Sequence, residues 1–116
     1  MITKRRGDTF EFPFIATDEE GNETVVIEKG TILRCGVRST LSGAEYSLFQ
    51  EIVTEEETSA VDFVFSASET AKLTPSDELA EYDAFYIVEV EVTFPNGIVR
   101  TPFQEELEVE RDYVYE

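Results

Sequence analysis

The amino-acid sequence predicts an all-β protein in which two antiparallel sheets pack face to face as a sandwich. Apolar and polar residues alternate in most segments of the chain, which is the period of a strand with one buried face. Turn-forming residues separate these segments at the short intervals typical of sandwiches. The 41% hydrophobic content, with nine Phe, is sufficient for one core in a chain of 116 residues. We therefore expect a single domain over residues 1–116, with about seven or eight strands.

The first half of the chain predicts a series of strands. The segment 9–15 places Phe10, Phe12 and Phe14 on one face. Pro13 on its other face predicts a sheet edge, because proline cannot donate a ladder hydrogen bond. The further strands expected here are a short one at 24–27 after a turn at 18–22, one at 31–38 with Leu33, Cys35 and Val37 inward and Arg34 and Arg38 outward, and one around Tyr46, Leu48 and Gln50.

The second half is expected to combine strands with one or two short helical turns. Ser66 and Glu69 have capping-box spacing ahead of good helix formers, which predicts a helical turn. A second turn is expected over 74–82, with Pro75 at its first helical position. A hairpin is expected at 95–97, because the dipeptide Asn-Gly tolerates positive φ. The expected strands are residues 60–66 with Val61, Phe63 and Phe65 inward, residues 85–94 with Tyr86, Val88, Val90, Val92 and Phe94 on one face, residues 98–103, and a last segment that contains Leu107 and Val109.

The side-chain inventory argues against catalysis. The chain contains no His and one Cys, so the usual general base and transition-metal ligands are missing. Pairs of carboxylates arise by default among 26 acidic residues, and there is no Trp to stack on a sugar ring. We expect Cys35 to be a buried core residue, and we expect no catalytic residue, no cofactor and no dedicated metal site. A loose calcium site among loop carboxylates is the alternative that stays open, since the loop at 18–29 lacks the Gly and Glu that an EF-hand requires.

The charge distribution predicts basic protein partners. With 26 acidic and nine basic residues, the chain has a net charge of -17, which repels nucleic acid and anionic membranes. No apolar run approaches the length of a membrane span, so we expect neither a cleaved signal peptide nor a membrane-spanning segment. Residues 1–6 concentrate positive charge and are expected to form an N-terminal arm. The candidate partner-binding residues are Lys4, Arg5 and Arg6 in this arm and Tyr113 and Tyr115 near the C-terminus.

Several short segments of the chain resemble a family of bacteriophage proteins. They are Gly7-Asp8-Thr9, Gly30-Thr31 followed by residues 32–38, and residues 68–73, 86–90 and 96–101. In these segments the chain is similar to small tail and baseplate proteins with an immunoglobulin-like sandwich, such as the N-terminal module of baseplate upper proteins. The resemblance implies a non-enzymatic structural component of the virion, in the tail, the baseplate or the head-tail connection. It also implies contacts with other virion proteins, in multiple copies of a symmetric assembly, after synthesis in the cytoplasm of the bacterial host.

Two functions of other classes fit the same sequence. The net charge of -17 suits an acidic inhibitor that mimics nucleic acid, which would bind a basic DNA-binding protein with steep salt dependence. A host-glycan recognition module is the other alternative, with tyrosine side chains such as Tyr82 as contacts. The three functions can be separated experimentally. The protein composition of purified particles tests the virion component, the salt dependence of binding tests the mimic, and a glycan array tests the glycan module.

Overall fold

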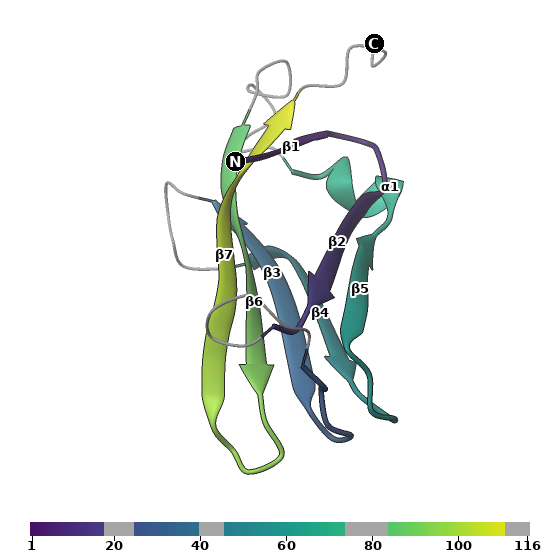
Figure 1. Cartoon of the computed structure of the whole chain (residues 1–116). Coiled ribbons are helices and arrows are strands. Elements are labelled where there is room, and N and C mark those ends of the chain that lie inside the picture. Colours follow the sequence, from purple (N-terminus) through teal and green to yellow (C-terminus); the bar gives the residue numbers. More distant parts are fainter. Residues whose placement is uncertain (18–24, 40–45, 74–83, 111–116) are drawn as a thin grey trace.

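The chain forms two sheets that face each other, as the computed structural model in Figure 1 shows. The structure describes residues 1–17, 25–39, 46–73 and 84–110. The large sheet has five strands in the order β1-β7-β6-β3-β4, and the small sheet has two, β2 and β5. The all-β fold with two sheets is confirmed, and its immunoglobulin-like topology stays a prediction. In the described residues the elements are β1 (Ile2–Arg5), β2 (Phe10–Ile15), β3 (Ile32–Ser39), β4 (Tyr46–Val53), β5 (Ala60–Phe65), α1 (Ala67–Thr70), β6 (Ala84–Thr93) and β7 (Val99–Glu110).

The core consists of four Phe rings of the small sheet packed against the inner face of the large one. Phe10 and Phe12 of β2 and Phe63 and Phe65 of β5 are all buried. Phe12 contacts both Phe10 and Phe65 edge to face, with ring centroids 6.1 Å apart in each pair. The alternation in the sequence predicts these facings correctly. It also predicts most of the buried residues of the large sheet, among them Leu33, Cys35, Val37, Tyr86, Val88, Val90, Val92, Leu107 and Val109.

The N-terminal residues form a strand of the large sheet rather than the free arm that the sequence predicts. β1 runs parallel to β7, with Ile2 opposite Leu107, and the backbone N–H of Arg6 donates to the carbonyl oxygen of Glu110 at 2.9 Å. Ile2 packs against the core, and Arg6 is buried. The arm prediction is wrong because Ile2, Lys4 and Arg6 alternate with exposed residues, as in an edge strand that buries long cationic stems. The parallel pair also corrects the expectation of purely antiparallel sheets.

The predicted hairpin joins β6 to β7. The N–H of Phe94 donates to the carbonyl oxygen of Ile98 at 2.9 Å, and the N–H of Gly97 donates to that of Phe94 at 2.8 Å. Gly97 has a φ of 90°, the left-handed conformation that the last residue of such a loop adopts. Phe94 is exposed because β6 ends at Thr93, so its predicted place on the buried face is wrong.

β7 is one continuous strand of 12 residues, where the sequence predicts two separate segments. Its pairing with β6 changes register between Val90, which lies opposite Phe103, and Val92, which lies opposite Arg100. β7 therefore contains one extra residue in this interval, and Pro102 lies within it. A proline is tolerated at such a bulge and at a sheet edge, so Pro102 does not interrupt the strand.

The predicted capping box begins the helix α1. The N–H of Glu69 donates to Ser66 Oγ at 3.3 Å, and the N–H of Ser66 donates to the Glu69 carboxylate at 3.1 Å. Thr70 in the same helix is buried, and its hydroxyl donates to the carbonyl oxygen of Asp8 at 2.6 Å. The helix thus holds the turn that follows β1. The second helical turn predicted over 74–82 lies outside the described residues.

Two predictions for the middle of the chain have different outcomes. The strand expected around Tyr46 is β4, which extends to Val53. The short strand expected at 24–27 is wrong in the described part of that segment, where Val26 is exposed and Ile27 forms an isolated bridge to Thr58. Ile27 is buried, so a single apolar side chain anchors the segment without a strand ladder.

Replacing Val90 by Asp should destabilise the protein by about 3 kcal/mol or more, because an unpaired carboxylate would enter the core. Val90 is 2% exposed and lies opposite Cys35 of β3 and Phe103 of β7. Urea unfolding measures the change. Val99→Asp is the matched control, since Val99 is 47% exposed and should change stability by roughly 0.5 kcal/mol or less. A urea midpoint for Val90→Asp equal to that of the wild type would contradict the inward position of Val90.

Candidate functional site

The outward-facing surface of the large sheet is the candidate functional site. No described strand or helix covers it, since the small sheet packs on the opposite, inner face (Figure 1). Its side chains alternate along each strand with the core residues and therefore point to solvent. We define the outer sheet face by Arg34, Gly36 and Arg38 of β3, Tyr46, Phe49 and Glu51 of β4, Glu89, Glu91 and Thr93 of β6, and Gln104 of β7.

Two aromatic side chains lie on the outer sheet face in fixed positions. The ring of Tyr46 covers the backbone of Gly36 and occupies the space that a side chain at position 36 would need. The Tyr46 hydroxyl donates to the Glu89 carboxylate of β6 at 2.7 Å, so this side chain extends from β4 across β3 to β6. Phe49 packs beside Tyr46 with 5.6 Å between ring centroids. Tyr46 and Phe49 remain 45% and 47% exposed, and such ordered rings lose little conformational entropy on binding.

Ion pairs across the strands lie beside the aromatic pair. Arg34 contacts Glu51 of β4 at 3.2 Å and Glu91 of β6 at 3.3 Å, so one guanidinium connects three strands. Arg38 Nε lies 3.3 Å from a carboxylate oxygen of Glu89. The Arg34 pairs are partly exposed, and such ion pairs contribute little to stability. Their main effect here is to fix the orientation of the polar groups around Tyr46.

The hydrogen bond between Tyr46 and Glu89 changes the pKa of both groups. This bond is the largest cause that raises the pKa of Tyr46 to about 12, with burial and the charges of Glu89 and Glu91 adding to it. For Glu89, burial acts to raise the pKa, but hydrogen bonds from Tyr46 and two further side chains outweigh burial and lower it. At neutral pH the phenol is therefore protonated and donates to an ionised carboxylate.

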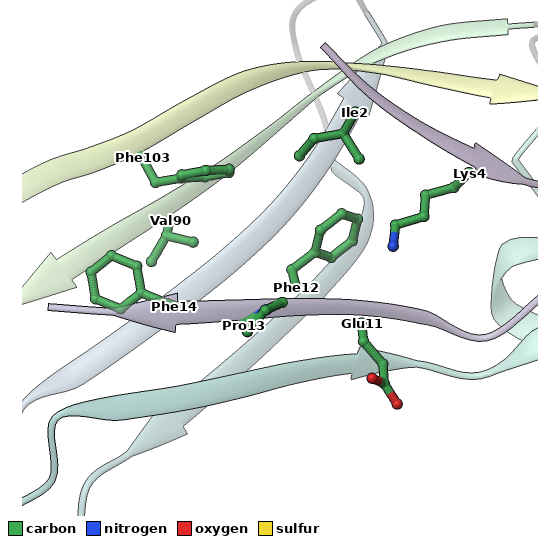
Figure 2. Close-up of a pocket in the computed structure, with 8 residues that line it drawn as sticks. All are labelled: Ile2, Lys4, Glu11, Phe12, Pro13, Phe14, Val90 and Phe103. Atoms are coloured by element: carbon green, nitrogen blue, oxygen red, sulfur yellow. The ribbon is translucent and has the colours of Figure 1, made fainter.

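A pocket lies on one side of the sandwich, where β2 faces the large sheet (Figure 2). Its volume is about 250 Å³. On the other side of the sandwich, the N–H of Val64 in β5 donates to the Gln50 side chain of β4 at 3.0 Å, which ties the two sheets together. A hydrogen bond therefore connects the two sheets on one side of the sandwich, and the pocket separates them on the other. The pocket is lined by Ile2, Lys4, Glu11, Phe12, Pro13, Phe14, Val90 and Phe103.

The structure does not bring the predicted partner-binding residues together. Lys4 lines the pocket, and its Nζ lies 5.6 Å from the centroid of the Phe12 ring. Arg5 is exposed, whereas the adjacent Arg6 is buried and its Nε donates to the carbonyl oxygen of Leu73 at 3.1 Å. Arg6 therefore has a structural role. Tyr113 and Tyr115 lie outside the described residues.

The described residues include one cysteine, and it is buried in the core. Burial raises the pKa of Cys35 to about 12, which keeps this thiol protonated. Within residues 1–17, 25–39, 46–73 and 84–110, no three His, Cys, Asp or Glu side chains are grouped to hold a metal ion. No helix in the same part of the chain has the length and hydrophobicity of a membrane span. The acidic loop at 18–24, considered for calcium, lies outside the described residues.

Comparisons with family models, with curated proteins and with solved structures found no match to this chain. The proposals below therefore rest on the residues of this chain and on their arrangement.

Sequence reasoning missed Tyr46, Phe49 and Glu89 as members of one site. These residues are far apart in the chain, and only the register of β4, β3 and β6 brings them together. One local signal was present. Gly36 interrupts a strand of otherwise bulky residues, and a glycine inside a strand often marks the close approach of another group.

Replacing Arg6 by Met should cost about 1–3 kcal/mol, because the buried carbonyl of Leu73 loses its hydrogen bond from Arg6. Arg5→Met is the matched control and should change stability by about 0.5 kcal/mol or less, since Arg5 is exposed. Chemical denaturation of both variants measures the difference. Equal, small effects would contradict the structural role of Arg6.

Tyr46 should ionise near pH 12 rather than near its ordinary pKa of 10. Its raised pKa stabilises the folded state up to pH 10, and this contribution should disappear as the pH rises through about 12. For Glu89 the pKa is lowered, so its contribution is present above the ordinary pKa of 4.5 and lost as the pH falls.

Titration of the Tyr46 ring signals by NMR tests this interpretation. Glu89→Gln should bring the pKa of Tyr46 back toward 10, whereas Glu51→Gln, on the same face but without a hydrogen bond to Tyr46, should leave it raised. Identical titrations of Tyr46 in the wild type and in Glu89→Gln would show that the hydrogen bond is not the cause.

Proposed function

We propose that this protein is a non-enzymatic structural module that joins neighbouring proteins through its outer sheet face. We further propose that it acts in a bacteriophage virion, in the tail, the baseplate or the head-tail connection, with other virion proteins as partners and in multiple copies. The observation that carries the proposal is the ordered, half-exposed pair of Tyr46 and Phe49 on the uncovered face of the large sheet.

Tyr, Phe and Arg are the residue types enriched in protein interfaces, and binding energy concentrates at a few such anchors. The outer sheet face presents Tyr46 and Phe49 with Arg34 and Arg38 beside them. The contacts of Tyr46 to Gly36 and Glu89 hold its ring before any partner arrives. This preorganisation supports recognition of a protein surface, since part of the entropy cost of binding has been met on folding.

Charge supports a basic partner over a second copy of this chain. The net charge of -17 makes two copies repel each other, and it attracts a partner with an excess of Lys and Arg. On the outer sheet face, the arginines are already paired with Glu51, Glu89 and Glu91. Glu106 of β7 is exposed next to this face. Its carboxylate could pair with Lys or Arg side chains that surround an apolar patch on the partner.

The strand order supports an immunoglobulin-like topology, and the sequence resemblance supports the virion proposal. In variable-type immunoglobulin domains the strands G, F, C and C′ share one sheet and B and E lie in the other, which corresponds to the order β7-β6-β3-β4 against β2-β5 here. The segments similar to baseplate upper proteins include the Gly30-Thr31 turn, the start of β6 and the Asn96-Gly97 hairpin. We propose on this basis that the domain is immunoglobulin-like.

The outer sheet face suits a protein interface better than a nucleic-acid mimic. A mimic needs an array of free carboxylates in the places of phosphates, whereas Glu51, Glu89 and Glu91 are paired with arginines. The experiment below includes the outcomes that would favour the mimic or the glycan-binding module instead.

Mass spectrometry of purified particles tests the virion proposal, which predicts this protein at a constant stoichiometry. The double substitution Tyr46→Ala/Phe49→Ala should reduce incorporation at least about tenfold, because two interface anchors are lost. Phe94→Ala is the matched control, since Phe94 is 41% exposed in the hairpin and not on the outer sheet face, and it should incorporate normally. Thermal unfolding of each variant verifies that the fold is retained.

Several results would contradict the proposal. Absence of the protein from particles would remove the virion assignment. Capture of a DNA-binding protein with steep salt dependence would favour the mimic, and a defined signal on a glycan array would favour the glycan module. Normal incorporation of the double variant would show that the outer sheet face is not the contact surface.

A further inference from the structure

The pocket on the open side of the sandwich is formed by apolar side chains from both sheets. Ile2 of β1, Val90 of β6 and Phe103 of β7 come from the large sheet, while Phe12 and Phe14 come from β2 of the small one. Concave apolar sites with a few polar groups at the rim are the usual form of small-molecule sites. The volume of about 250 Å³ equals about eight water molecules at their share of liquid volume. A chain of eight carbon atoms is of comparable size.

Lys4 supplies the polar group at one end of this pocket. Figure 2 shows its side chain extending from β1 toward the ring of Phe12, and Nζ lies 5.6 Å from the ring centroid. Lys4 is half-buried, and none of the ion pairs among the described residues involves it. Within the part of the chain that the structure describes, the Phe12 ring is the only partner of the Lys4 ammonium group, although the chain has 26 acidic residues. Its charge is thus available to an anion that enters the pocket.

The Glu11 carboxylate does not neutralise Lys4. It lines the rim of the pocket, but its carboxylate points away from Lys4 and from the apolar side chains, on the outer side of β2 (Figure 2). The interior of the pocket therefore combines apolar walls with a single positive end. This combination complements a ligand with an aliphatic chain and one negative head group.

We propose that the pocket binds an aliphatic carboxylate of medium chain length, of the fatty-acid type. The aliphatic chain lies among Phe12, Phe14 and Phe103, and the carboxylate binds the Lys4 ammonium group. The proposal is independent of the outer sheet face, which lies on the opposite side of the large sheet. Failure of either one leaves the other unaffected.

The strand edges beside the pocket argue against an added peptide strand as its occupant. β1 pairs only with Leu107–Glu110 of β7, so the earlier part of β7 is an edge, and Pro102 lies in it. β2 carries Pro13 on the small sheet's edge beside the pocket. Prolines at both edges remove ladder donors and disfavour strand addition. A small ligand does not need those donors.

Titration of the full-length protein with octanoate, followed by NMR of the Ile2 and Val90 methyl groups, tests the proposal. Octanoate should shift both signals with saturation. Lys4→Met keeps an unbranched apolar stem but removes the charge, and it should weaken octanoate binding at least about tenfold. Octanol should bind the wild type more weakly than octanoate and should bind Lys4→Met and the wild type equally well.

Lys29→Met is the matched control, since Lys29 is exposed and does not line the pocket, and it should bind octanoate like the wild type. Phe103→Ala should weaken octanoate and octanol alike, because both lose the same apolar contact. The proposal is overturned if octanoate leaves the Ile2 and Val90 signals unchanged, or if octanol binds as tightly as octanoate. Equal octanoate affinity of Lys4→Met and Lys29→Met would overturn the proposal as well. So would a peptide with a C-terminal leucine carboxylate that binds the wild type more tightly than octanoate does.

Discussion

The structure depends on one geometric constraint: a sheet of two strands has to cover the inner face of a sheet of five. Phe10, Phe12, Phe63 and Phe65 meet it, because an aromatic side chain buries more surface than any aliphatic one and four of them lie on two paired strands. Smaller residues in β2 and β5 would leave the valines and leucines of the large sheet in contact with water. The position of these rings also determines which parts of the large sheet remain open.

The two sides of the sandwich differ as a result. On the side of β4 and β5, the Gln50 side chain accepts the Val64 N–H and ties the sheets together. On the side of β2 and β7, β1 covers only the end of β7, and the remaining gap is the pocket lined by Lys4 and Phe103. The small sheet leaves the outer sheet face uncovered, so the large sheet separates this face, which we propose as the protein contact surface, from the concave pocket on its inner side.

Much of the fold follows from local patterns in the sequence. The alternation around Leu33, Cys35 and Val37 and the capping box at Ser66 each predicted an element, because one buried face or one pair of orphan N–H groups determines the local conformation. β1 was missed because Lys4 takes one of its inward positions and Arg6 is buried directly after it, and the contacts of both depend on partners distant in the chain. The outer sheet face was missed for the same reason, since Tyr46 reaches Glu89 only through the register of three strands.

Hydroxyl-radical footprinting of Tyr46 and Phe49, in the free protein and in purified particles, tests most directly whether the outer sheet face makes the functional contact. Both rings are half-exposed in the free chain and should be oxidised there. In the assembly both should be protected, while Phe94 in the hairpin between β6 and β7 should react equally in the two states. Equal oxidation of Tyr46 and Phe49 before and after assembly would contradict the role assigned to this face.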